Sequence, residues 1–209
     1  MKKLLFAVSA LAALALLAPS TGFAQHELSS NNQVGLFLNA DGTGASSTVE
    51  IGVPVNVYLV LINPTDVENA ETPYPDINAF ECMLHFTGPI PFKLADTMPV
   101  GVNVGDASNI NQGFLEYIVG FGASELVVNG SVTMISFQFM TTSPGLTEIN
   151  LTQTRFPSIP NEMAFQSVSG QLRVMHNASG TKDGIVFAFN GGVVAVENES
   201  FGSVKALFR

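Results

Sequence analysis

Residues 53–62 read VPVNVYLVLI, and residues 79–86 read AFECMLHF. In the first stretch, five aliphatic side chains occupy alternate positions and so share one face of a strand. They are Val53, Val55, Val57, Leu59 and Leu61. The opposite face is only partly polar, which predicts a strand in the middle of a sheet. The second stretch places Phe80, Cys82, Leu84 and Phe86 on one face and Ala79, Glu81, Met83 and His85 on the other. This alternation predicts a strand that is half buried in an antiparallel sheet.

An acidic, proline-rich segment, residues 63–76, joins these two strands. Its opening, Asn63-Pro64-Thr65-Asp66, is a turn signal, because proline cannot continue a central strand. The segment is long for a sandwich loop, and long loops are often functional, although a solvated surface excursion is the simpler interpretation. Candidate partner-binding residues are Asp66, Glu68, Glu71, Tyr74 and Asp76 in this segment, together with Met83 and His85 on the open face of the next strand.

The remaining chain continues as short apolar stretches separated by turn signals. Asn129-Gly130 is a tight-turn pair that predicts a hairpin between strands at 126–128 and 132–140. Other predicted strands are 34–38, 91–94, 114–121, 146–151 and 165–174, and the first stretch extends back to Thr48. Residues 185–189 and 193–196 predict a terminal hairpin around Asn190-Gly191-Gly192. No amphipathic helix separates these strands. The sequence therefore predicts an all-β protein, an antiparallel jelly-roll or immunoglobulin-like β-sandwich with a C-terminal β-hairpin and a short tail.

The N-terminus has the features of a targeting segment. Lys2 and Lys3 precede an apolar run, and Gly22-Phe23-Ala24 supplies the small residues that a signal peptidase reads. The apolar run is short for a transmembrane anchor. The predicted organisation is a signal peptide at 1–24, a polar leader at 25–33, a β-sandwich at 34–176, and a hairpin with a short helical tail at 177–209 that packs on the sandwich. The expected location is outside the cell, in the periplasm or at the cell surface, without membrane insertion after cleavage.

The net charge narrows the possible partners. The formal net charge is −9, and it becomes more negative once Lys2 and Lys3 are removed, so binding to nucleic acid or to an anionic membrane is not expected.

Cys82 is the single cysteine and shares a face with Phe80 and Leu84, which predicts a small core residue rather than a reactive thiol.

No catalytic constellation is visible. The three histidines, His26, His85 and His176, are not accompanied by a hydrolase or metalloprotease motif, so we expect a protein without catalytic activity and without a cofactor. A secreted hydrolase of another type stays open as an alternative. Asn39 and Asp41 match two positions of a calcium-binding loop, but the remaining ligands of such a loop are missing, and a hairpin turn is the simpler interpretation.

Binding is the expected function, and two ligand classes are open. Polysaccharide binding usually needs exposed aromatic rings, whereas this chain has no tryptophan and three tyrosines, of which Tyr74 is expected to be exposed. Protein–protein contact is therefore favoured, with a carbohydrate-binding module as the alternative.

Three stretches resemble cohesin domains, the nine-stranded jelly-roll modules of bacterial extracellular proteins. They are Gly52–Val57 leading to Asn63, the strand Phe80–Phe86, and Asn129–Phe139 followed by Gly145–Ile149. The resemblance spans about residues 34–174 and implies a non-catalytic sandwich that binds a protein partner. A cohesin usually shows a Tyr-Asp pair where this chain has His85-Phe86-Thr87-Gly88, and no recognition motif for a dockerin is matched. The resemblance therefore implies the fold and the class of function but no particular binding residues.

Overall fold

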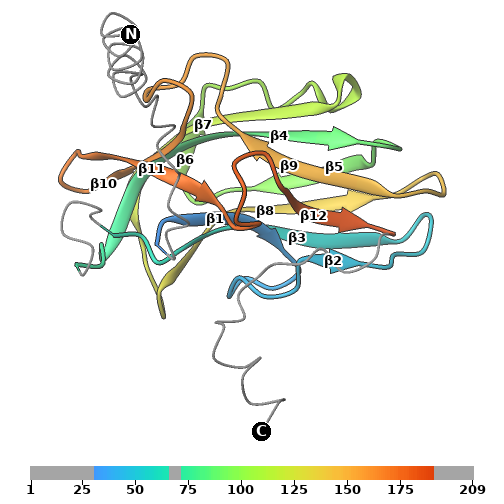
Figure 1. The fold of residues 1–209 in the computed structure, drawn as a ribbon, viewed down its shortest axis with the longest axis horizontal. Helices are drawn as coiled ribbons and strands as arrows, with labels where there is room; N and C mark the ends of the chain where they lie inside the picture. Colours follow the sequence, from blue (N-terminus) through green and yellow to red (C-terminus); the bar gives the residue numbers. More distant parts are fainter. Residues whose placement is uncertain (1–30, 66–71, 191–209) are drawn as a thin grey trace, which may run out of the picture.

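Two layers of β-strands pack face to face (Figure 1) in the computed structural model, which describes residues 31–65 and 72–190. The strands are β1 (Gln33–Phe37), β2 (Ser46–Ser47), β3 (Pro54–Ile62), β4 (Asp76–Thr87), β5 (Phe92–Thr97), β6 (Gly101–Asn103), β7 (Phe114–Leu126), β8 (Ser131–Met140), β9 (Thr147–Thr152), β10 (Met163–Ser167), β11 (Leu172–Asn177) and β12 (Ile185–Phe189). One 3₁₀ turn, η3, spans Ile110–Gln112. The predicted all-β sandwich is confirmed. Within the described ranges, no helix is long and apolar enough to span a bilayer.

The strands form two sheets that are joined along one side. The first sheet has the order β5-β8-β3-β1. In the second sheet β6 pairs with β7 and β7 with β4, while β9 and β10 share the other edge of β4. On that edge β9 also pairs with β12, which in turn pairs with β2, and β10 also pairs with β11. Strand β11 also runs parallel to β1 and so connects the two sheets. All other pairs are antiparallel except β2 with β12.

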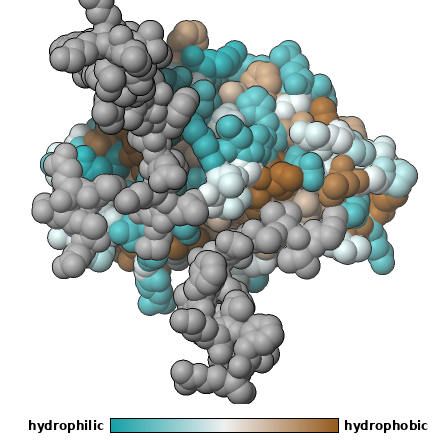
Figure 2. All heavy atoms as spheres, viewed as in Figure 1, coloured by the Kyte–Doolittle hydropathy of each residue, from teal (hydrophilic) through white to brown (hydrophobic). Residues whose placement is uncertain are grey.

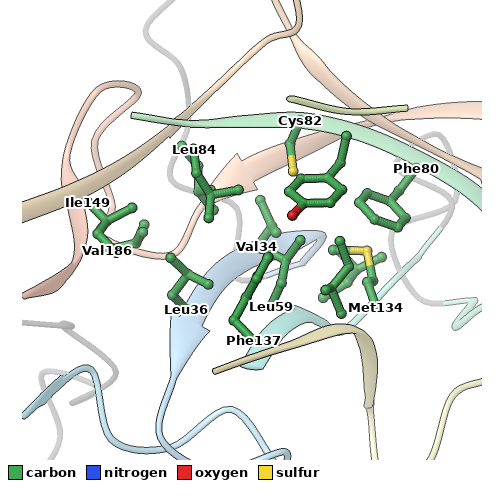
Figure 3. Packing of buried hydrophobic residues seen from close by; sticks show 14 of the residues in the cluster. Val34, Leu36, Leu59, Phe80, Cys82, Leu84, Met134, Phe137, Ile149 and Val186 are labelled. Carbon is green, nitrogen blue, oxygen red and sulfur yellow. The ribbon is translucent and has the colours of Figure 1, made fainter. Parts of the chain in front are cut away.

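The core lies between the sheets and follows the predicted alternation. Phe80, Cys82 and Leu84 point from β4 toward Leu36, Leu59 and Phe137 of the first sheet (Figure 3), and all six are buried. Val57, Leu59 and Leu61 are buried as predicted. Strand β3 lies between β1 and β8, which confirms its central position. On the face drawn in Figure 2, apolar side chains are interspersed among polar ones.

Two of the predicted strands are longer than the strands in the structure. The stretch 165–174 is not one strand but the hairpin of β10 and β11, closed by a Gly170 N–H to Ser167 carbonyl hydrogen bond of 2.9 Å. Gly170 has a φ of +82°, a left-handed conformation that glycine adopts without strain. Strand β3 begins at Pro54 rather than at Thr48, because a turn with Gly52 at φ +82° precedes it and leaves Val53 exposed.

The predicted boundaries differ at the N-terminal side. Gln33 belongs to β1, and Asn32 is buried, so the fold starts before the end of the predicted leader at residue 33. Asn32 is held there by a long-range contact, because its side-chain oxygen accepts a hydrogen bond from the Thr65 N–H at 2.6 Å.

At the other end, Ile185–Phe189 forms β12, which lies between β9 and β2. The proposed signal peptide, the second strand of the predicted terminal hairpin and the short helical tail lie outside the described residues.

Candidate functional site

The outward face of the second sheet carries a groove whose floor is made of two cross-strand rows. One row runs Val104, Ile118, Glu81, Ala164 and the other runs Val102, Gly120, Ala79, Gln166, in each case across β6 or its extension, β7, β4 and β10. Strand alternation places these residues outward, because their neighbours Phe80, Val119 and Phe165 point into the core. The groove therefore exists because the neighbouring strands β6 and β7 pair in this register with β4 and β10 from other parts of the sequence.

The groove is hollow where Gly120 lies in β7. A Cβ atom added there would have no heavy atom within 4 Å, so the missing side chain leaves open space. The cavity has a volume of about 430 Å³. Its walls are apolar and open to solvent: Val102 is 66 %, Val104 74 % and Leu172 42 % exposed. Soluble proteins rarely leave such contiguous apolar surface uncovered without a functional reason.

Strand β6 lies very close to β7. A Cβ atom at Gly101 would come within 2.7 Å of the Gly120 carbonyl oxygen, so glycine is needed at position 101. Val104 continues the pairing beyond β6 by donating its N–H to the Ile118 carbonyl at 2.9 Å. This close pairing holds the two valine side chains side by side along one wall of the groove.

A buried carboxylate lies in the floor of the groove. Glu81 on β4 is only 5 % exposed, and it accepts hydrogen bonds from the Ser158 N–H at 2.6 Å and from the Ser158 hydroxyl at 3.0 Å. Both oxygens of the carboxylate therefore hold the loop 153–162 against the outer face of β4. Buried polar groups need such partners, because an unpaired carboxylate would lose its hydration without compensation.

A second carboxylate fixes the start of the same loop. Glu116 on β7 accepts hydrogen bonds from the Arg155 N–H at 2.8 Å and from its guanidinium at 2.5 and 3.1 Å. These hydrogen bonds lower the pKa of Glu116, while burial opposes the shift. The guanidinium also lies 5.6 Å from the centre of the Phe114 ring. Glu81 and Glu116 together fix the loop 153–162 at the side of the groove.

Met83 and His85, the predicted binding residues on β4, lie on the same outer face as the groove but do not line it. Both are half buried. The His85 ring centre is 6.4 Å from that of Phe114, and burial lowers the pKa of His85. Met83 and His85 therefore share the outer face of β4 with Ala79 and Glu81, as predicted from the alternation. Of these four residues, Ala79 and Glu81 line the groove.

The acidic segment is described only at its two ends. Asp66, Glu68 and Glu71 lie outside the described residues. Tyr74 is half buried rather than exposed: its ring lies edge-on to Phe165 at 6.0 Å between ring centres, and its hydroxyl donates to the Gln171 side chain at 3.0 Å. Asp76 begins β4 and is partly buried, and one of its carboxylate oxygens has no hydrogen-bond partner.

The weak calcium candidates belong to a turn. The Asp41 carboxylate accepts hydrogen bonds from the N–H and the hydroxyl of Thr43, at 3.1 and 2.6 Å, and the Asn39 amide donates to the same hydroxyl at 2.9 Å. These side chains stabilise the turn that follows β1. Across residues 31–65 and 72–190, no group of three or more histidine, cysteine, aspartate or glutamate side chains is arranged to hold a metal ion.

The other buried titratable groups contribute to the core. Cys82 is fully buried, as predicted, and burial raises the pKa of its thiol. The Tyr117 hydroxyl and the Lys93 ammonium both donate to Asp96, at 2.8 and 2.6 Å. Burial works to raise the Asp96 pKa, but these hydrogen bonds outweigh it and lower the pKa. This pairing ties β5 of the first sheet to β7 of the second.

Sequence reasoning missed the groove walls, because no strand was predicted between residues 94 and 114. The stretch Val100-Gly101-Val102-Asn103-Val104 has the period of a strand with three valines on one face. That alternation was the available signal for β6. Gly120 and Leu172 line the groove only because distant strands pair, so the sequence around each of them gives no signal of this position.

Comparisons with known proteins concern the fold. No protein-family model and no curated protein matches the chain. The type II cohesin dyad from the adaptor ScaA scaffoldin of Acetivibrio cellulolyticus is similar in structure, with a TM-score of 0.51 and 12 % identity over 78 % of this chain and 49 % of that chain. The sixth cohesin of scaffoldin B from the same organism, solved in complex with a Cel5 dockerin mutant, has a TM-score of 0.49 and 10 % identity over 78 % of this chain and all of that chain. At this identity the likeness is one of fold alone.

Proposed function

We propose that this chain, whose fold is a cohesin-like β-sandwich, is an exported, non-catalytic module that binds a protein partner through the groove on the outer face of its second sheet. The observation that carries the proposal is the exposed apolar lining of this groove, above all Val102, Val104 and Leu172 around the open space at Gly120.

The chemistry of the groove favours a protein partner. Its floor and walls are mostly apolar, and the Glu81 carboxylate in its floor is already occupied by Ser158. A partner therefore gains mainly by inserting apolar side chains, as in the centre of protein–protein interfaces. The net charge of the chain, −9, favours a partner whose apolar ridge is flanked by basic side chains.

The acidic segment 64–76 is proposed to act on the rate of this association. It contains Asp66, Glu68 and Glu71, and charges that attract an oppositely charged partner raise the association rate more than the final affinity. Replacing these three residues with serine should slow association and weaken its salt dependence. An unchanged rate and salt dependence would remove the segment from the proposal.

Capture from the secreted proteins of the source organism tests the binding function. Three baits are compared: the wild-type chain, Val102→Lys in the groove, and Val128→Lys as a matched control. Val128 is 62 % exposed, similar to the 66 % of Val102, and it does not line the groove. A specific partner is retained by the wild type and by the control but not by Val102→Lys. Its direct binding is then measured with the two purified proteins. Equal retention by all three baits would reject the groove as the binding site.

Export is tested separately. If residues 1–24 are a signal peptide, the secreted protein begins at Gln25, and its intact mass shows the loss of Lys2 and Lys3. A secreted protein that still contains both lysines would contradict the proposed cleavage.

A further inference from the structure

Strand β6 lies at the border of its sheet and has a free edge. In the part of the chain that the structure describes, β6 pairs with β7 and with no other strand. Its outer side therefore carries backbone N–H and C=O groups that no neighbouring strand uses. We propose that this edge accepts an extended segment of a basic protein partner, which adds to the sheet as a further strand beside β6.

The groups that face this edge follow from the hydrogen bonds to β7. The Val100 carbonyl and the Val104 N–H both bond to β7, at 2.6 and 2.9 Å. In an antiparallel pair, the residues at the alternate positions turn their N–H and C=O groups away from the partner strand. Gly101 and Asn103 therefore turn these groups toward the free edge, and both residues are partly exposed.

The β6 edge lacks the features by which proteins prevent unwanted strand addition. Charged side chains, proline and bulges are the common means. Residues 100–104 read Val-Gly-Val-Asn-Val, and the pairing of β6 with β7 has no register shift. The edge strand β5 of the first sheet differs, because it contains Lys93 and Asp96 and its pairing with β8 shifts between Lys93 and Ala95. This contrast indicates that the β6 edge is left open to a strand.

The free edge is short, and both of its ends are defined. Before it, Pro99 has no N–H to donate. After it, the Gly105 N–H donates to the Asn103 side-chain oxygen at 2.9 Å. The same oxygen accepts the Ile118 N–H at 2.9 Å, which holds β6 against β7. An added strand therefore bonds to Gly101 and Asn103, each of which offers one donor and one acceptor.

An extended peptide is the occupant that matches this edge. A strand repeats its N–H and C=O groups at the same spacing as β6, so its main chain supplies affinity and its alternate side chains supply specificity. The side chains of Val100, Val102 and Val104 are largely exposed and can pack against apolar side chains of the added strand. The net charge of −9 opposes a second copy of this chain and favours a basic partner.

A designed peptide tests the edge directly. The probe is Lys-Val-Thr-Val-Thr-Val-Lys with an acetylated N-terminus and an amidated C-terminus. One analogue carries N-methyl groups on both threonines, and a second carries them on two of the valines. The analogues have the same side chains and the same number of N-methyl groups, so they differ only in which N–H groups remain. Binding is followed by the hydrogen exchange of backbone amides, measured by NMR.

We expect the peptide to slow exchange at the Gly101 and Asn103 amides. The Val104 amide, which already donates to β7, and the amides of β5 should change little. With the peptide valines beside Val102, the threonine N–H groups face β6 in an antiparallel addition and the valine N–H groups face it in a parallel one. One analogue should therefore bind like the parent peptide, and the other about tenfold or more weakly, because its methylated nitrogens cannot donate to β6.

The proposal is overturned if the peptide does not bind, if the two analogues bind equally, or if the protected amides lie on another surface. Slow exchange at Gly101 and Asn103 before the peptide is added would also contradict it, because the edge would already be occupied by a second copy or by another segment of this chain. Gly101 and Asn103 do not line the groove, whose binding is measured with a native partner, so either proposal can fail without the other.

Discussion

The carboxylate of Glu81 accepts two hydrogen bonds from Ser158, one from its N–H at 2.6 Å and one from its hydroxyl at 3.0 Å. These residues are far apart in the sequence, and their contact brings the loop 153–162 to the side of the groove. Glu81→Ala should therefore speed hydrogen exchange at the Ser158 amide and lower the free energy of unfolding by about 1–3 kcal/mol. Glu50→Ala, which changes an exposed glutamate outside the strands, serves as the control. Unchanged exchange at Ser158 would show that Glu81 does not hold the loop.

Stability should depend on pH through Glu116. Hydrogen bonds from Arg155 lower the pKa of Glu116 in the folded protein below its ordinary value of 4.5. Its contribution to stability is therefore fully present above about pH 4.5 and is lost as the pH falls through the folded-state pKa. In urea unfolding measured from pH 6 to pH 3, Glu116→Gln should lose less stability on acidification than the wild type. Parallel curves for the two proteins would contradict this assignment.

Phe137 tests the register of the core. Its ring is buried, 5.6 Å from the Tyr117 ring and 5.2 Å from the Phe139 ring between centres. Phe137→Ala should lower the free energy of unfolding by about 3–5 kcal/mol, because it leaves a cavity between the sheets. Gln138→Ala, one position along β8, faces outward and should cost little. Similar losses for the two variants would show that the strand faces are assigned wrongly.

The Cys82 thiol should be chemically inert in the folded protein. It is fully buried, and burial raises its pKa, so the reactive thiolate is scarce at neutral pH. A thiol-specific colorimetric reagent should react with the native protein only at the rate of unfolding and with the denatured protein at once. Rapid reaction of the native protein would place the thiol at the surface.

Much of the sandwich could be predicted from local sequence, because alternation and turn chemistry are local signals. The faces of β4 follow from the alternation of Phe80 and Glu81, and the hairpin before β8 follows from Asn129-Gly130, whose φ values are +52° and +79°. The two faces of a strand could therefore be predicted from the sequence, whereas the strands that pair with it could not.

The groove depends on these neighbours. It requires Gly120 of β7 to lie opposite Val102 of β6 and Ala79 of β4, a relationship that arises only from the paired sheet. The division of 165–174 into two strands was missed for a different reason. Its apolar pattern runs through the turn at Gly170, so the turn signal Ser169-Gly170 was outweighed by the alternation around it.

The affinity of Gly120→Val for a purified partner tests the central claim most directly. The added side chain enters the open space at position 120, and a β-branched residue suits a strand, so the variant should fold at least as stably as the wild type. Isothermal titration should show binding of the partner to Gly120→Val weakened by about tenfold or more, while Val128→Lys keeps the wild-type affinity. Equal affinity of Gly120→Val and the wild type, with both proteins folded, would contradict the claim that the groove binds the partner.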